Sequence, residues 1–305
     1  MEKINVKAIE ELIKKYNDLE LQEILLSKYK IAPCLIILKD NIGDIFNEYH
    51  HHDLYEILYV KEGKIIYSIE EKQYELNEGD LILISPTTLH KLDKIISSNS
   101  KRIILTFTES FAKAISTNTT NILKCFDISL KNKVFKLSFS HDLRKVLEKY
   151  FNSLLNLQFS NEYGDDLFYY LRFTQTMIFI NKEIMNMTHD DHLFNINHKI
   201  VAEIIEYINK NIDKKIHISD IAKKLSMSES RLSHVFKENT GISILKYIIK
   251  KRLVLAKELI RKGEHLNNIY ISCGFQDNTS FFRAFKKEYG ITPKTYYTTY
   301  KLTNE

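Results

Sequence analysis

An imperfect internal repeat near the C-terminus is the feature that most restricts how this chain can fold. The segment Phe236–Ser243 (FKENTGIS) recurs 49 residues later as Phe285–Thr292 (FKKEYGIT). In each copy a glycine follows a short amphipathic stretch, which is a common way for a helix to end. The duplication predicts two equivalent helix-turn-helix units within one helical segment.

The positive charge of the chain is concentrated in the part that carries the repeat. The formal net charge of the 305 residues is +5, but the segment from Lys199 onward holds 20 Lys and Arg against 11 Asp and Glu. The rest of the chain has 24 Lys and Arg against 28 Asp and Glu, so it is slightly acidic. Excess positive charge favours binding to nucleic-acid phosphates without specifying a base sequence.

Composition is that of a soluble globular protein and excludes several other classes. A hydrophobic content of 44% is ordinary, and 305 residues suffice for two compact domains. No segment approaches the ~20 apolar residues of a membrane span, and the first residues contain no apolar signal core. We therefore expect a cytoplasmic protein without a membrane partner. Cys34, Cys125 and Cys273 lack metal-site spacing, which predicts buried free thiols.

Changes in periodicity predict two domains joined by a polar linker. Residues 1–187 begin with a helix over 3–30, continue with a small antiparallel barrel or sandwich over about 34–108, and end with helices over 140–159 and 165–187. A linker over 188–197 precedes the helical segment 198–305. The expected strands are Leu35–Leu38, Tyr55–Lys61, Lys64–Ile69, Asp80–Ile84 and Arg102–Phe107.

The first helix-turn-helix unit is expected to consist of helices over about 219–225 and 229–239. Ser219 and Ser228 are their predicted N-caps, and Gly241 is expected to end the second helix. The buried stripe of the second helix should be Leu232, Val235 and Phe236. Its outer face should then present Ser230, Arg231, Ser233, His234 and Lys237.

The second unit is expected to have a first helix over Ile269–Cys273, a turn at Gly274 and a second helix that Asp277 caps. The predicted buried residues of that second helix are Phe281, Ala284 and Phe285, and its predicted outer face is Asn278, Thr279, Phe282, Arg283 and Lys286. Side chains of these types read base edges: arginine contacts guanine, asparagine contacts adenine, and serine or threonine contacts either.

A continuous helical pattern over Ile244–Arg261 joins the two units. A helix of this length spans ~27 Å at ~1.5 Å per residue. It can therefore hold two second helices roughly one DNA turn apart, near ~34 Å, on the same side of the duplex.

Five short motifs in the last hundred residues are specific enough to indicate a family. They are Ile218–Ala222 (ISDIA), Ser230–Lys237 (SRLSHVFK), Gly274–Asp277 (GFQD), Phe281–Lys287 (FFRAFKK) and Gly290–Pro293 (GITP). With them, residues 199–298 resemble the DNA-binding domain of AraC/XylS-family bacterial regulators. The resemblance implies seven helices, with both second helices in successive major grooves. It assigns base reading to Ser230, Ser233, His234, Asn278, Thr279 and Arg283. Phe282 and Tyr297 depart from the family, which commonly has a small and a basic residue there.

The expected barrel contains two histidine-bearing segments. The first carries Gly43, His50, His52, Glu56 and Gly63, and the second carries Gly79, Pro86 and His90. In a continuous strand His50, His52 and Glu56 share one face, with His51 opposite. The segments resemble the paired motifs of cupin barrels, although the first has one extra residue and the second lacks a glycine after Pro86 and has His90 one residue closer. AraC-like regulators commonly carry such a barrel as an effector sensor.

Together these resemblances imply an α+β two-domain protein. Its N-terminal domain should be a cupin-like β-barrel with flanking helices, and its C-terminal domain should be an all-α tandem helix-turn-helix.

The histidine-bearing segments allow three interpretations. In the leading one no cofactor is needed. His50, His52, Glu56 and His90 hydrogen-bond a small polar effector such as a sugar, and aromatic surface comes from Tyr49, Tyr55, Tyr59 and Tyr67. The same four polar residues could instead bind a first-row divalent metal. In the third interpretation the histidines are structural.

The sequence therefore predicts a ligand-responsive transcription regulator, not an enzyme, with promoter DNA, a small molecule and RNA polymerase as partners. The resemblance implies a homodimer. The apolar face of helix 165–187 would pack either within the subunit or against a second one, and it consists of Leu167, Tyr170, Leu171, Thr174, Met177 and Ile178. Two alternatives stay open: a metal-dependent cupin enzyme with an appended helical domain, and a regulator controlled by a protein partner.

Overall fold

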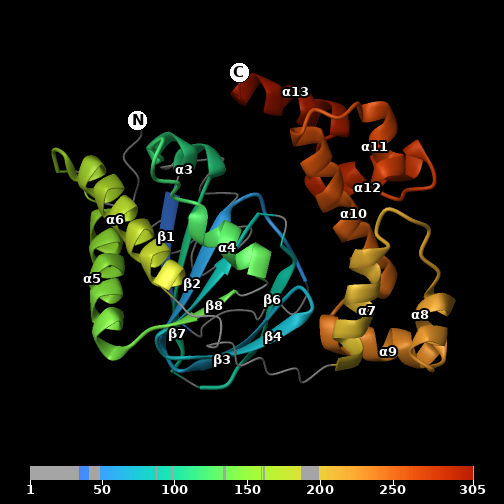
Figure 1. Ribbon diagram of the computed structural model, residues 1–305, viewed down its shortest axis with the longest axis horizontal. Helices are drawn as coiled ribbons and strands as arrows, with labels where there is room; N and C mark the ends of the chain where they lie inside the picture. Colours follow the sequence, from blue (N-terminus) through green and yellow to red (C-terminus); the bar gives the residue numbers. More distant parts are fainter. Residues whose placement is uncertain are drawn as a thin grey trace. The chain divides into compact units, whose positions relative to one another are not determined.

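The computed structural model in Figure 1 describes residues 34–40, 49–86, 88–97, 99–132, 135–158, 160, 162–186 and 199–304. The chain separates into two compact units, Met1–Asn195 and Ile196–Glu305. The helix expected over 3–30, Gly43 and the linker expected over 188–197 lie outside the described residues. None of the described helices has the length and apolarity needed to cross a membrane.

Two antiparallel sheets form the N-terminal unit. The larger has the order β1 (Cys34–Asp40), β7 (Lys101–Phe107), β2 (Tyr55–Glu62), β5 (Asp80–Ile84) and β8 (Lys136–Ser138). The smaller has the order β4 (Lys72–Asn77), β3 (Lys64–Ile69) and β6 (His90–Ile95). The five predicted strands all form. Strands β4, β6 and β8 were not predicted, because β4 and β6 are rich in charged and polar residues and β8 has only three residues.

The larger sheet is buried on both faces, and strand alternation divides its side chains between two cores. Ile57 and Tyr59 of β2 belong to the core beneath the helices, whereas Leu58 and Val60 belong to the core between the two sheets. We call the second of these the barrel interior. Four helices contribute to the first core: α3 (Glu109–Ile115), α4 (Lys124–Asn132), α5 (His141–Leu157) and α6 (Asp165–Asn186).

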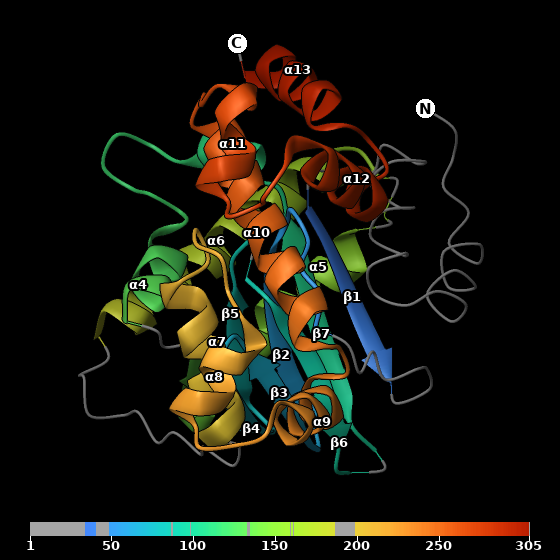
Figure 2. The same cartoon turned by 90° about the vertical axis from the view of Figure 1, so that its right-hand side faces the viewer.

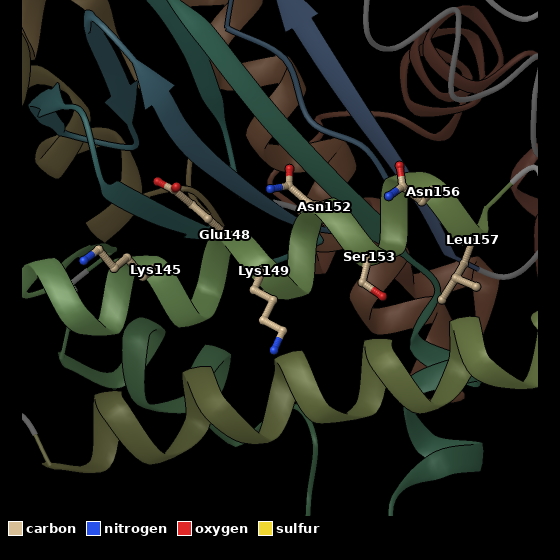
Figure 3. A pocket seen from close by; sticks show the side chains of 7 residues that line it. All are labelled: Lys145, Glu148, Lys149, Asn152, Ser153, Asn156 and Leu157. Carbon is tan, nitrogen blue, oxygen red and sulfur yellow. The ribbon is translucent and has the colours of Figure 1, made fainter.

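Helices α5 and α6 match the two predicted helices and lie side by side on the sheet, as Figure 1 shows. A shallow hollow on α5 is lined by that helix alone, through Lys145, Glu148, Lys149, Asn152, Ser153, Asn156 and Leu157. In Figure 3 Glu148 points toward the sheet and Ser153 toward α6. Glu148 Oε1 accepts a hydrogen bond from Tyr59 at 2.5 Å, and Ser153 Oγ accepts one from Arg172 Nε at 3.2 Å. The side chains of Glu148 and Ser153 are therefore already engaged in packing α5 against the sheet and α6.

The apolar face predicted for α6 is wrong as a single face. Met177 is fully buried, but Leu167 and Leu171 are 62% and 64% exposed, and Ile178 is also exposed. The inward residues include Tyr169, Phe173, Met177 and Ile180. The predicted face combined two stripes that a helical step of ~100° per residue separates.

The C-terminal unit is helical throughout its described part, as predicted. Its seven helices are α7 (Lys199–Lys210), α8 (Ile218–Lys224), α9 (Glu229–Thr240), α10 (Ile244–Arg261), α11 (Leu266–Ser272), α12 (Asn278–Tyr289) and α13 (Pro293–Asn304). Helices α8 and α9 form one helix-turn-helix unit and α11 and α12 form the other, with α10 between them. Figure 2 shows α10 leading from the α9 end of the unit to α11 and α12.

The internal repeat is visible in the conformation of the backbone. Ser228 and Asp277 cap α9 and α12, and Gly241 and Gly290 end these helices with φ of 78° and 72°. The turns also correspond, since a left-handed residue follows each first helix: Ser226 at φ 53° and Gly274 at φ 77°. The predicted cap at Ser219 is wrong. Helix α8 begins at Ile218 with His217 as its N-cap, which places Ser219 inside the first turn.

Within the C-terminal unit, helix α10 also connects the two helix-turn-helix units through Arg252. Its guanidinium donates to the carbonyl oxygens of Ile212 at 3.2 Å and Lys214 at 2.6 Å, in the loop before α8, and lies over the ring of Phe275 in the second turn. Gly274 approaches the same loop. A Cβ added to Gly274 would lie 2.4 Å from the Ile212 carbonyl oxygen. All three cysteines are buried and free, as expected.

We predict that Gly274→Ala destabilises the C-terminal unit by about 3 kcal/mol or more, because left-handed strain adds to overpacking against backbone. Gly263→Ala is the matched control, since Gly263 has φ of 83° but no atom within 4 Å of an added Cβ. It should cost only about 1–2 kcal/mol. Calorimetric unfolding of the full chain measures both, and equal losses would contradict the close approach.

Candidate nucleic-acid interface and effector site

Helix α9 divides cleanly into a buried and an exposed face. Leu232 and Phe236 are fully buried, and the Phe236 ring meets Tyr247 of α10 at 5.5 Å and an interplanar angle of 83°. Val235, expected in the buried stripe, is half-buried. The predicted outer residues Ser230, Arg231, His234 and Lys237 are exposed, and Ser233 is half-buried. The outer face is therefore polar and accessible within this unit.

Helix α12 repeats this arrangement. Phe281 and Phe285 are fully buried, and Ala284 is half-buried. The predicted outer residues Asn278, Thr279, Arg283 and Lys286 are all exposed. Phe282, which was also predicted on the outer face, is half-buried instead. Its ring stands perpendicular to that of Phe281 at 5.6 Å and packs against the apolar cluster around α10. We refer to α9 and α12 as the reading helices.

The start of α12 is a well-formed cap. Asp277 Oδ1 accepts from the Ser280 backbone N–H at 2.7 Å, and Oδ2 accepts from the Ser280 hydroxyl at 2.7 Å. The backbone N–H of Ser280, its hydroxyl and the nearby Arg283 hold the pKa of Asp277 below its ordinary value. The cap is therefore ionised at neutral pH. Because the cap positions this end of α12, it also positions Asn278 and Thr279.

In the N-terminal unit the structure brings together His50, His52, Glu56 and His90, which we call the histidine cluster. The rings of His50 and His90 lie 4.3 Å apart, and those of His52 and His90 lie 5.0 Å apart. His52 Nε2 is 2.9 Å from Glu56 Oε2. The predicted reason for this convergence was only partly right. Residues 51–54 are not in a strand, and His50 joins the barrel through a single bridge to His90.

Backbone carbonyls orient two of the imidazoles. His52 Nδ1 lies 3.0 Å from the Leu54 carbonyl oxygen, and His90 Nδ1 lies 2.8 Å from that of Thr88. A carbonyl oxygen can only accept, so both Nδ1 atoms carry the proton. Burial, with smaller contributions from His50 and His52, lowers the pKa of His90 well below its ordinary value. His90 is therefore neutral, and its Nε2 is a buried acceptor without a hydrogen-bond partner in the described structure.

The donor set of the cluster fits a divalent cation. One atom each from His52, Glu56 and His90 lie within 4.8 Å of one another. The Nδ1–H to carbonyl hydrogen bonds are the usual outer-shell arrangement of metal-binding histidines. The 2.9 Å contact between His52 Nε2 and Glu56 Oε2 also brings two of these atoms close enough for one cation to contact both.

Two predicted effector residues do not join the cluster. Tyr59 lies on the opposite face of β2 from Glu56, beneath the helices, where it donates to Glu148. Tyr49 is buried, and its hydroxyl donates to the Glu70 carbonyl oxygen at 2.8 Å. The tyrosine beside the cluster is Tyr67, whose ring stacks on His90 at 6.1 Å and 15°. Tyr59 lies away from the cluster because positions 56 and 59 of one strand face opposite sides of the sheet.

Two cationic residues near this cluster were not predicted from the sequence. Arg102 on β7 is only 7% exposed, and Lys39 on β1 is half-buried directly opposite it. Arg102 also pairs with Val60, whose side chain lies in the barrel interior, so Arg102 and Lys39 face that interior. The available signal was weak, because each residue stands beside another charged residue at the end of an apolar strand.

Comparisons with known proteins agree with both halves of this description. Residues 35–170 match the family described as AraC-like ligand binding domain, and residues 221–299 match the helix-turn-helix domain family. Together the two matches cover most of the chain.

Similar proteins include the probable transcriptional regulator LumQ of Photobacterium leiognathi, 25% identical over 251 residues, which covers 81% of this chain and 91% of LumQ. The transcriptional activator RhaS of Mannheimia succiniciproducens is 25% identical over 252 residues, covering 82% of this chain and 89% of RhaS. Among solved structures, the C-terminal domain of the response regulator AraT from Geobacillus stearothermophilus is 29% identical, with a TM-score of 0.33 over 33% of this chain and 86% of that domain.

The paired helix-turn-helix units and the antiparallel sheet domain before them thus correspond to two known domain families. The chain belongs to the AraC/XylS family of DNA-binding transcription regulators with an N-terminal ligand-binding domain.

Proposed function

We propose that the two reading helices enter successive major grooves of promoter DNA. Base edges would be read by Ser230, Ser233 and His234 on α9 and by Asn278, Thr279 and Arg283 on α12, while Arg231, Lys237 and Lys286 would hold phosphates. The observation that carries this proposal is the duplicated geometry: two capped helices whose apolar faces are buried and whose polar faces are exposed. The length of α10 supports a spacing of about one DNA turn.

The barrel would sense a small polar effector through the histidine cluster. His90 Nε2 supports this role, because a buried acceptor without a partner is costly unless a ligand supplies a donor. Effector binding would favour one arrangement of the regulator and so change promoter occupancy or contact with RNA polymerase. The protein would act in the cytoplasm as a regulator without enzymatic turnover.

Selection from random duplexes tests the tandem geometry. We expect two short motifs spaced by ~10 bp. Arg283→Ala should lose ~1–3 kcal/mol of discrimination at one base position, because a guanidinium contact to a base edge is sequence-specific. Lys286→Ala should weaken all sequences alike and lower the salt slope by about 1.

Lys145→Ala, with the same charge change on α5, is the control and should leave DNA binding unchanged. A single selected motif, or an Arg283→Ala variant with unaltered preference, would exclude the proposed interface.

The exposed stripe of α6 would be a homodimer interface. Leu171, Ile178 and Met185 recur every seven residues, and Leu167 extends the stripe by one turn. All four are exposed in the single subunit. In a coiled coil each of the two apolar heptad positions recurs every seven residues, and this series would supply one of them.

We predict that Leu171→Glu weakens self-association at least ~10-fold, because it removes a buried leucine worth ~1.5–3 kcal/mol. Leu130→Glu on α4 is the control, since Leu130 is 46% exposed and lies outside the stripe. Sedimentation across a concentration series measures both variants. A wild-type protein that stays monomeric at micromolar concentration would refute the interface.

A divalent cation is the second candidate occupant of the histidine cluster, favoured by the orientation of the two Nδ1 atoms. When bound, it would supply a Lewis-acidic point for an oxygen or nitrogen of the effector. This second candidate predicts about one equivalent of a first-row metal per chain after purification without affinity resin.

The double variant His52→Ala/His90→Ala should lose this metal, whereas the exposed His141→Ala should keep it. Elemental analysis decides the matter. Clearly substoichiometric metal in the wild-type protein would exclude the metal site, and only the effector interpretation would remain.

A further inference from the structure

The barrel interior holds two cations in directly opposed positions on neighbouring strands. Lys39 of β1 pairs with Arg102 of β7, and directly opposed residues of antiparallel strands have their side chains on the same face. Like charges in such positions destabilise a sheet. Burial lowers the pKa of Lys39 to about 8, with Arg102 lowering it and Glu56 raising it. With a pKa of about 8 Lys39 is still mostly protonated at neutral pH, so Lys39 and Arg102 together place two positive charges on this face of the sheet.

One hydrogen-bond donor of Arg102 lacks an acceptor. The residue is only 7% exposed, and its Nε has no hydrogen-bond partner in the described structure. Burial lowers the pKa of Arg102, and the nearby Tyr67 and Glu56 oppose this effect. Oxygen Oε2 of Glu56 is already in contact with His52 Nε2 at 2.9 Å. Among the described residues no acceptor faces the Nε–H of Arg102.

Other charged groups of the smaller sheet do not supply the missing acceptor. Asp93 forms an ion pair with Lys91 at 2.8 Å and accepts from Ser68 at 2.5 Å. Ser68 alternates with Tyr67 and Ile69, which face the barrel interior, so this ion pair lies on the other face of the smaller sheet. A buried guanidinium that keeps an open donor is poised to bind a planar anion, since its N–H groups match a carboxylate in a two-point contact.

We propose that Arg102, with Lys39 beside it, binds the carboxylate of the effector, so that the effector is an organic acid and not a neutral sugar. This proposal rests on the proposed function of the barrel as an effector site. Tyr67 connects the two ends of the site, since its ring stacks on His90 and its phenol interacts electrostatically with Arg102. The acceptor His90 Nε2 would then take a hydroxyl or other donor of the same molecule.

The test compares acids with their neutral amides on the full-length protein. The probes are lactate and lactamide, hexanoate and hexanamide, and phenylacetate and phenylacetamide, with glucose and arabinose as neutral polyols. Titration calorimetry measures each affinity. We expect at least one acid to bind, with its amide about tenfold weaker or more, because the amide cannot accept a charge-assisted pair of hydrogen bonds.

Variants assign the effect to Arg102. Arg102→Met should abolish the preference for the acid over its amide, and Arg102→Lys should weaken acid binding but retain that preference. Arg172→Met on α6 removes the same charge outside the barrel interior and should change neither affinity. The acid-to-amide ratio of the wild-type protein needs no variant, so the proposal stays testable if Arg102→Met does not fold.

The outcomes separate this proposal from the proposed function. Binding of amides or sugars as tight as that of the acids would overturn the organic-acid assignment and leave an effector-binding barrel. Failure of acids, amides and sugars alike to bind at millimolar concentration would overturn both. An acid preference that Arg102→Met retains in folded protein would also overturn the assignment to Arg102.

Discussion

The burial of aromatic side chains along α10 is the constraint on which the DNA-binding unit depends. Near its first turn Tyr247 packs edge-to-face against Phe236 of α9, and further along Leu253, Ala256 and Ile260 share a core with Phe281 and Phe285 of α12. Each reading helix is thus anchored by phenylalanines to a different part of one continuous helix. Because that helix is continuous over eighteen residues, it fixes the outer faces of α9 and α12 relative to each other.

The contact of Arg252 with the loop before α8 extends the same principle. Its guanidinium donates to two backbone carbonyls of the loop before the first helix-turn-helix unit and lies over the Phe275 ring in the turn of the second. Gly274 has no side chain at the point where the second turn meets that loop. The two helix-turn-helix units are therefore not independent modules on a tether. A duplex that binds one of them meets the other at a position set by packing, which reduces the entropy lost on forming the second contact.

In the N-terminal unit the governing constraint is the alternation of side chains across a sheet that is buried on both faces. The residues of β2 at one parity seal the helix-covered core, and those at the other parity enter the barrel interior together with Arg102 and Lys39. This arrangement explains why polar groups gather in one place although their strands are distant in sequence. It also explains why Tyr59, one of the most buried tyrosines, lies apart from the histidine cluster.

The sequence by itself determined the order of helices in the C-terminal unit and the bounds of α10, because glycine stops and 3.6-residue periodicity are local properties, although it misplaced the N-cap of α8. It also named the residues of the histidine cluster, although residues 51–54 are not in the expected strand. Only the tertiary structure decided which tyrosine joins that cluster, that the apolar face of α6 splits between core and surface, and that Arg102 lies opposite Lys39. Those facts depend on the pairing of distant strands and on which face of an element meets a neighbour. Such long-range choices are made by packing and leave little trace in local sequence.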